Sequence, residues 1–178
     1  MPAPEYTEAA SNTLSNSLAG DNPWRTNWVA GIIGGVRATS CAKRVALLLG
    51  HDEPQVRATA AGTLGELVAR EFRKEVEELL SDPELEVVAA AVRALGLMGS
   101  ADSIGLISPL LTSDNSHLRA GVAWSLGMLG SRDHTNQIAQ LAQKDPDPLV
   151  RRWALIGLGF LDPLGQAHTF ALCARDSD

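Results

Sequence analysis

Four histidines are the side chains best suited to acid–base or metal chemistry in this sequence: His51, His117, His134 and His168. A zinc site on helices needs ligands at a spacing such as i and i+4, or a cysteine partner at ligand spacing. No two of these histidines have that relation, and no cysteine accompanies them. The sequence therefore predicts no metal site, and only His117 is kept as a candidate binding residue.

The two cysteines and the glycine strings predict no catalytic chemistry either. Cys41 has no adjacent base to activate a thiolate. Cys173 shares a repeat column with three leucines and an alanine, and we expect it to be a buried small hydrophobe: Leu49, Leu80, Leu111 and Ala142. The strings at 31–35 and 157–159 lack the G-x-G-x-x-G spacing of a phosphate loop and lie inside helical patterns, so we interpret them as close-packing or groove-floor glycines. We expect neither an enzyme nor a cofactor.

The elements that must position any binding residues repeat along the chain. A Leu-Gly or Ile-Gly step recurs with glycine spacings of 31, 31, 31 and 32 residues: Gly34, Gly65, Gly96, Gly127 and Gly159. Apolar residues follow helical spacing around each step, and a second helical pattern lies between consecutive steps. The intervening strings HDEP, SDPE, TSDN and KDPDP supply residues that cap or open helices. No stretch alternates with period two, so we predict no strands.

A helix pair of this length cannot bury its own apolar face, so successive pairs must stack and share one core. We predict an all-α fold, a right-handed α-solenoid of about five helix pairs plus a terminal helix, in a single domain over residues 1–178. The units are expected at about 5–37, 38–68, 69–99, 100–130 and 131–162, with a half-unit at 163–178. Either the array ends on a lone helix or the chain is part of a longer array, and both readings stay open. Small residues should let neighbouring helices approach closely: Ala30, Ala60, Ala61, Ala91 and Ala123.

The recurring string D-x-x-x-x-V-R-x-x-A-A-x-x-L-G resembles HEAT repeats, specifically the short HEAT-like repeats of the phycobilisome-lyase type. Three units carry it best: Asp52 with Arg57, Asp114 with Arg119, and Asp147 with Arg151. The resemblance covers roughly residues 21–176. It implies that aspartates and arginines form a ladder that ties each loop to its neighbours. Thr26 and Val88 stand at the arginine position of two units and predict a weaker or altered ladder there.

The same resemblance implies that the glycine-containing helices line a concave, ligand-facing surface, and all four tryptophans fall in columns that would face it. The last glycine helix is apolar on two faces, and both need to be covered. The second stripe of this helix consists of Leu149, Trp153, Ile156 and Phe160. We expect it to form an apolar patch with Trp124 and Met128, which lie one repeat earlier. Arg93, Arg152 and His117 are expected at the edge of this patch. Aromatic residues beside arginine are typical of protein-binding hot spots. Coverage by the chain's own last helix or a loop is the alternative.

Trp24 and Trp28, at i and i+4, belong to the first unit, at the other end of the repeat array from the predicted patch. We expect them to form either a second binding site or an end cap, and of the two we favour the cap.

Charge and hydropathy narrow the class of partner. A net charge of −6 argues against nucleic acid, because phosphate contacts require a basic surface. No apolar run reaches the ~18 residues that span a bilayer, and the first residues do not resemble a secretory signal, so we expect no membrane and a cytoplasmic protein.

The predicted function is a non-catalytic scaffold or adaptor that binds a protein partner. One alternative is a subunit of a bilin lyase or tetrapyrrole chaperone, with Arg93 or Arg152 pairing the propionates. The other is a structural subunit that uses the patch to form a homodimer.

Overall fold

The computed structural model describes residues 13, 16–18, 22–162 and 169, and every regular element within them is helical. The all-α prediction is therefore confirmed for this part of the chain. The expected half-unit at 163–178 and the part of the first unit before residue 22 fall almost wholly outside the described residues, as do His168 and Cys173. The chain divides into two compact units, Met1–Ala94 and Leu95–Asp178, which are described separately.

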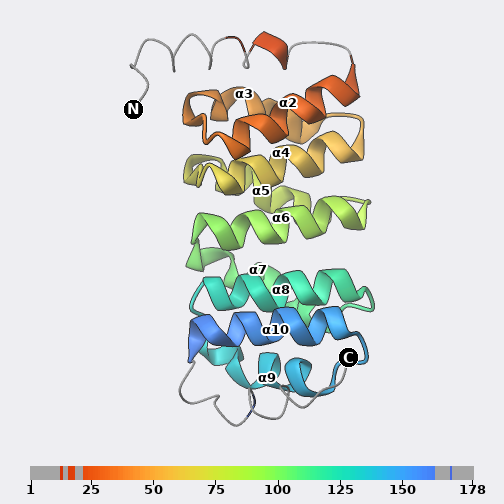
Figure 1. The fold of residues 1–178 in the computed structure, drawn as a ribbon, viewed down its shortest axis with the longest axis vertical. Helices are drawn as coiled ribbons and strands as arrows, with labels where there is room; N and C mark the ends of the chain where they lie inside the picture. Colours follow the sequence, from red (N-terminus) through yellow and green to blue (C-terminus); the bar gives the residue numbers. More distant parts are fainter. Residues whose placement is uncertain (1–12, 14–15, 19–21, 163–168, 170–178) are drawn as a thin grey trace. The chain divides into compact units, whose positions relative to one another are not determined.

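The first unit has its helices in two layers (Figure 1). Helix α2 (Pro23–Gly35) packs beside α4 (Pro54–Glu66), and the shorter α3 (Ala42–Ala46) and α5 (Arg73–Glu78) lie behind them. Short 3₁₀ turns flank these two short helices: Thr39–Cys41, Leu47–Gly50, Arg70–Phe72 and Leu79–Ser81. The second helix of each predicted pair is thus a brief α-helix between two tighter turns.

The second unit repeats this arrangement (Figure 1). Helix α6 (Leu85–Met98) contains the boundary between the units, and α8 (Ser116–Met128) packs against α10 (Pro148–Leu161). Helices α7 (Ile104–Ile107) and α9 (Thr135–Lys144) form the other layer, and α9 packs against α10. The 3₁₀ turns here are Ala101–Ser103, Ser108–Thr112 and Arg132–His134.

Loop side chains cap three of the long helices, and two of them, Asn115 and Asp147, lie in the strings expected to cap, whereas Glu53 before α4 makes no such bond. Asn22, Asn115 and Asp147 each accept a hydrogen bond from a backbone N–H in the first turn of α2, α8 and α10. Such caps satisfy donors that have no partner inside the helix. Proline opens α2, α4 and α10, at a position whose N–H is not needed.

Helices α2, α4, α6 and α8 each end next to a left-handed residue, whereas Asp162 after α10 has φ of −158°. Arg37 and Val68 have φ of 52° and 54°, and Gly99 and Gly130 have φ of 69° and 70°. After α4, the Ala69 N–H donates to the Leu64 carbonyl and the Val68 N–H to the Gly65 carbonyl, and equivalent bonds close α2 and α8. This is the Schellman motif, in which glycine is the residue usually found at the left-handed position.

The predicted core columns are buried. The aliphatic residue before each repeat glycine is fully buried: Ile33, Leu64, Leu95, Leu126 and Leu158. The five small alanines expected at helix contacts are also fully buried. In the column expected to be buried with Cys173, three of the four described members are buried and Leu80 is half-buried.

Glycines set the distance between α8 and α10. A Cβ added to Gly157 would lie 2.5 Å from the Ala123 carbonyl oxygen, and one added to Gly127 would overlap the Gly157 backbone. These two glycines therefore allow backbone to pack on backbone. Of the glycine strings, Gly157 has the predicted close-packing role, whereas a Cβ on Gly31 or Gly159 would meet nothing within 4 Å.

Candidate functional site

Two tryptophans on neighbouring helices form the centre of the predicted binding patch. The rings of Trp124 on α8 and Trp153 on α10 meet edge to face, with centroids 6.3 Å apart and an interplanar angle of 83°. This geometry places the positive edge of one ring against the negative face of the other. Both residues are half-buried. The contact therefore orients two large rings that each keep some surface open to solvent.

Five further residues extend this pair along the two helices, and we call the whole set the tryptophan-pair patch: Trp124, Met128, Leu149, Arg152, Trp153, Ile156 and Phe160. Met128 follows Trp124 by one turn, and Ile156 and Phe160 follow Trp153 by one and two turns. Met128 and Ile156 are each 36% exposed and Phe160 is 54% exposed. Leu149 is half-buried and Arg152 is exposed. The patch is thus an apolar surface partly open to solvent, with a cation beside it.

The patch residues of helix α10 lie on a different face from the residues that it buries in the core. Val150, Ala154, Leu158 and Leu161 are all buried, as the helical spacing predicts. The patch residues of α10 lie on another face at i, i+4, i+7 and i+11. The helix is therefore apolar on two faces, of which one is buried and the other is only partly covered.

The other two residues predicted at the patch edge, His117 and Arg93, have different positions. His117 is exposed in the first turn of α8. The Ser116 hydroxyl, the Leu149 N–H and the nearby charge of His117 hold the pKa of Asp147 below its ordinary value. Arg93 is exposed on the part of α6 that belongs to the first unit, so its place beside the patch stays a prediction.

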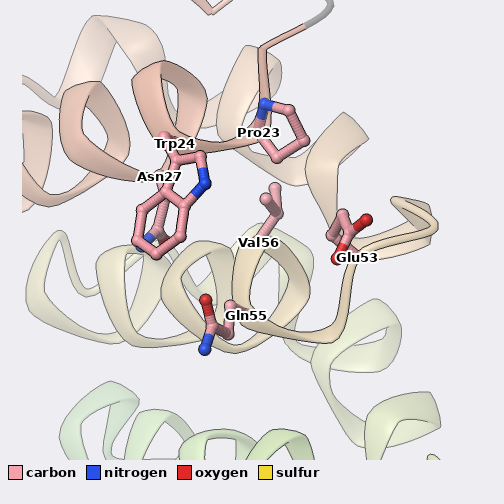
Figure 2. A pocket seen from close by; sticks show the side chains of 6 residues that line it. All are labelled: Pro23, Trp24, Asn27, Glu53, Gln55 and Val56. Atoms are coloured by element: carbon pink, nitrogen blue, oxygen red, sulfur yellow. The ribbon is translucent and has the colours of Figure 1, made fainter.

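Trp24 and Trp28 are the most exposed tryptophans of the chain's described part, at 78% and 70%. A shallow pocket of about 160 Å³ lies beside Trp24, where the start of α2 meets the start of α4 (Figure 2). Its lining comes from both helices and the loop before α4: Pro23, Trp24, Asn27, Glu53, Gln55 and Val56. Whether the tryptophans act as an end cap or a second site stays a prediction, but this pocket is a feature that the sequence did not predict.

The arginines of the motif do form a ladder, but their carboxylate partners are Asp82 and Asp145 and not Asp52 and Asp114 of the motif. Arg57 Nε and Nη2 donate to the two carboxylate oxygens of Asp82 at 2.7 and 2.9 Å. Its Nη1 donates to the carbonyls of His51 and Asp52 at 2.8 and 2.9 Å. Asp52 therefore contributes its backbone and not its carboxylate. The guanidinium joins its own loop to the following loop.

Arg119 has the same geometry in the second unit. Its Nε and Nη2 donate to the Asp145 carboxylate at 2.9 and 2.8 Å, and its Nη1 donates to the carbonyls of Ser113 and Asp114 at 2.8 and 3.0 Å. The two side chains are only 13% and 3% exposed. Arg151 Nη1 likewise donates to the Asp145 carbonyl of its own loop, at 3.1 Å. Bidentate pairs of this kind fix position as well as charge.

The pairing changes the proton affinity of both partners. Hydrogen bonds from the arginines hold the pKa of Asp82 and of Asp145 below the ordinary carboxyl value, despite the opposing effect of burial. The same bonds raise the pKa of Arg57 and of Arg119. These shifts have a structural cause, so they give no sign of a catalytic acid or base.

The position of Asp82 and Asp145 has a second role in the loop turn. In each of four loops, the side chain at this position accepts the backbone N–H two residues later: His51, Asp82, Ser113 and Asp145. In the sequence, His51 follows the unit with Thr26 at the arginine position, and Ser113 follows the unit with Val88 there. Arginine and aspartate are thus lost together, while the turn is kept. A search of the repeat columns for an arginine followed by an aspartate 25 or 26 residues later could have found the two ion pairs.

The remaining candidate chemistry is structural. His134 Nδ1 lies 2.7 Å from Ser131 Oγ, in the turn before α9. Cys41 is buried. Across the described ranges, no group of three or more His, Cys, Asp or Glu side chains is arranged to hold a metal ion. No helix among the same residues has the length and hydropathy to cross a membrane.

Helix pairs that repeat every 31 residues and share a core through their long helices define the class of α-solenoid repeat proteins. The sequence matches the profile of HEAT repeats over residues 41–116 and 74–159, more than half of the chain. The chain therefore belongs to the HEAT-repeat family. A search of curated protein sequences finds no match.

Solved structures agree with this fold. The complex of CpcE and CpcF of phycocyanin lyase from a Nostoc species contains a similar chain, with 18% identity and a TM-score of 0.72 over 86% of the present chain. The present chain spans 65% of that chain. An engineered protein is similar with 16% identity and a TM-score of 0.65, covering 95% of this chain and 90% of its own. At these identities the likeness establishes the fold alone.

Proposed function

We propose that this HEAT-repeat protein is a non-catalytic scaffold or adaptor that binds a protein segment on the tryptophan-pair patch. The observation that carries the proposal is the edge-to-face contact of Trp124 and Trp153, flanked by exposed Met128, Ile156 and Phe160. Large apolar groups that gather on one face of a soluble protein mark sites of interaction.

The chemistry of the patch suits a protein partner with an apolar segment. Tryptophan contributes large area at little conformational cost, and the mutual contact of the two rings already fixes their orientation. Met128 has a flexible thioether side chain that adapts to irregular surfaces. Arg152 adds a guanidinium at the edge that can pair with a carboxylate of the partner. The partner segment is thus expected to be apolar with acidic residues.

The test begins with folded variants of the patch. Phe160→Glu adds a charge at an exposed site, and Trp153→Glu with Phe160→Glu removes one ring of the pair as well. Leu47→Glu is the matched control, because Leu47 is 80% exposed and belongs to the first unit and not to α8 or α10. Circular dichroism first verifies that the helical fold is kept.

Immobilised wild type, control and Phe160→Glu proteins are then compared by quantitative mass spectrometry of what each retains from a lysate. We expect proteins retained by wild type and Leu47→Glu but lost with Phe160→Glu. Equal retention by all three would contradict a binding role for the patch.

Self-association is separated from partner binding by light scattering on the same proteins. A dimeric wild type with a monomeric, folded double variant would assign the patch to a homodimer interface. A double variant that unfolds, while Phe160→Glu stays folded, would place Trp153 in the core.

A second candidate function is a subunit of a bilin lyase or a tetrapyrrole chaperone, favoured by one observation. The flat face of one of the two perpendicular rings of Trp124 and Trp153 could stack on a conjugated chromophore, and the Arg152 guanidinium could pair one of its propionates. The fold of the phycocyanin lyase chain is compatible with this candidate. Titration with a linear tetrapyrrole should produce a visible absorption band with wild type and a weaker band with Phe160→Glu. No band with wild type would eliminate this candidate.

A further inference from the structure

The pocket between the starts of α2 and α4 combines three chemically distinct walls (Figure 2). The Trp24 indole and Asn27 lie on one side, Pro23 above, and Glu53 on the opposite side, with Val56 between them. It thus offers an aromatic face, an amide and a carboxylate around an apolar floor. All six lining residues belong to the first unit, so this site is independent of the tryptophan-pair patch.

Among the described residues, little covers the indole of Trp24. It is 78% exposed, and Trp28 lies one turn further along α2 with 70% exposure. The face of an exposed indole attracts a cation, and tryptophan is the best of the aromatic side chains at this. An aromatic surface left open beside a pocket therefore favours a flat or cationic ligand.

Two acceptors of the pocket have no hydrogen-bond or ion-pair partner among the described residues. Asn27 Oδ1 is buried and has no hydrogen-bond partner in the described structure. Glu53 stands at the N-cap position of α4, yet its side chain makes no capping bond there. Among described residues the Glu53 carboxylate has no recorded ion pair. The Asn27 oxygen has almost no accessible surface, so the exposed Glu53 carboxylate is the acceptor that a ligand with hydrogen-bond donors can reach.

From these observations we propose that the pocket binds the guanidinium of an arginine side chain presented by a partner protein. A guanidinium is planar and stacks on an indole, and two of its five N–H groups can donate to the exposed Glu53 carboxylate. The protein's net charge of −6 attracts a basic segment. An ammonium is a more strongly hydrated point charge that fits a flat aromatic wall less well.

The test uses small probes and a spectrum that reports the pocket directly. Isotope-labelled protein is titrated with N-acetyl-arginine methylamide while the Trp24 indole and Asn27 amide signals are followed by NMR. The neutral isostere N-acetyl-citrulline methylamide is the matched probe, and N-acetyl-lysine methylamide tests the ammonium. We expect saturable shifts with arginine at an affinity about tenfold higher than with citrulline or lysine.

Variants separate the contribution of each wall. Trp24→Ala should abolish the saturable shift of the Asn27 amide, and Glu53→Gln should weaken arginine binding about fivefold to tenfold. Glu78→Gln is the control, since it makes the same change of charge on an exposed residue of α5. Backbone signals of the variants verify that each remains folded.

The proposal is overturned if citrulline or lysine binds as tightly as arginine, if no probe shifts the Trp24 signal, or if Glu53→Gln and Glu78→Gln have equal effects. Arginine selectivity that disappears with Trp24→Ala and persists with Phe160→Glu would support it. This outcome does not depend on whether the tryptophan-pair patch binds a partner.

Discussion

Arg119, like Arg57, donates to three groups of two successive loops, so its loss should be damaging. In Arg119→Met, the Asp145 carboxylate stays buried without a guanidinium, and two loop carbonyls lose their donor. Breaking a buried pair in this way costs about 3 kcal/mol, because an uncompensated charge remains. We expect urea denaturation to show a fall of that size in the free energy of unfolding.

A matched arginine controls for the loss of a positive charge. Arg73 pairs with Glu77 at 3.0 Å, one turn away on the same short helix. Helical pairs at i and i+4 stabilise by about 0.5 kcal/mol, so Arg73→Met should have a much smaller effect. If the two substitutions were equally harmful, the interloop bonds of Arg119 would not be the cause.

Acid should remove the contribution of the ladder aspartates. The pKa of Asp145 is lowered in the folded protein, so its stabilising effect is present above the ordinary carboxyl pKa and is lost as the pH falls through the folded-state value. The difference in free energy of unfolding between wild type and Asp145→Asn should thus be constant near neutrality and shrink below about pH 4. Denaturation at a series of pH values measures it.

The same comparison in an Arg119→Met background provides the check. Without the guanidinium, the folded-state pKa of Asp145 should no longer lie below its ordinary value. A pH dependence that persisted unchanged in this background would mean that another group causes it.

At the scale of elements, two glycines of helix α10 should respond oppositely to the same substitution. In Gly157→Ala, the new methyl group would meet the Ala123 carbonyl and push α10 from α8, at a cost of about 2 kcal/mol. In Gly159→Ala, the methyl group meets nothing within 4 Å, and the helix gains about 0.5–1 kcal/mol. Thermal denaturation of the two variants distinguishes these signs. Two stabilised variants would show that glycine does not set the contact between the helices.

At the ends of the long helices, we also expect two opposite substitutions to change the free energy of unfolding in opposite directions. Val68 is left-handed at the position where Gly130 stands in a later repeat. A left-handed conformation costs a side chain roughly 1–2 kcal/mol, so Val68→Gly should raise the free energy of unfolding by about 1 kcal/mol after its own entropy cost. Gly130→Val should lower it by about as much as the strain. Chemical denaturation of both tests the pair, and a destabilised Val68→Gly would contradict the strain argument.

Repetition explains which elements could be predicted from the sequence. The buried column through Ile33 and Leu158 follows from one helical period written five times. Trp124 is expected beside the second stripe of the last glycine helix, to which Trp153 belongs, and the two rings are in contact. The 3₁₀ turns around α3 and α5 could not be predicted, because the same apolar residues suit a continuous helix. The Asp82 and Asp145 pairs were missed because the motif compares residues inside one unit, whereas the bonds join successive units.

At the scale of the whole molecule, prediction of sites was limited by distance along the chain. Asn27 and Glu53 belong to different helices, and neither has a sequence pattern that marks a ligand, so the pocket at Trp24 became visible only once α2 and α4 were placed together. The tryptophan-pair patch was easier, since aromatic residues at helical spacing on a helix with another buried face leave few alternatives.

The arginine ladder also restricts the order in which the repeats can stand. Each rung takes its cation from one repeat and its anion from the next, so a repeat unit is adapted to its successor. Deletion of residues 69–99, one unit, would remove Asp82 and bring Arg57 to the repeat that has Ser113 at the aspartate position. Deletion of residues 69–130, two units, would bring it to Asp145 instead.

Whole-unit gain and loss is therefore not neutral here, although the helices look interchangeable. Ser113→Asp should stabilise the one-unit deletion by about 2 kcal/mol, because the new carboxylate meets Arg57. In the intact chain it should change the free energy of unfolding by less than about 0.5 kcal/mol, since the turn bond to Asn115 is kept. Denaturation of the intact chain and the one-unit deletion, each with and without Ser113→Asp, measures how far a repeat depends on its successor. Equal effects of Ser113→Asp in both chains would show that no such dependence exists.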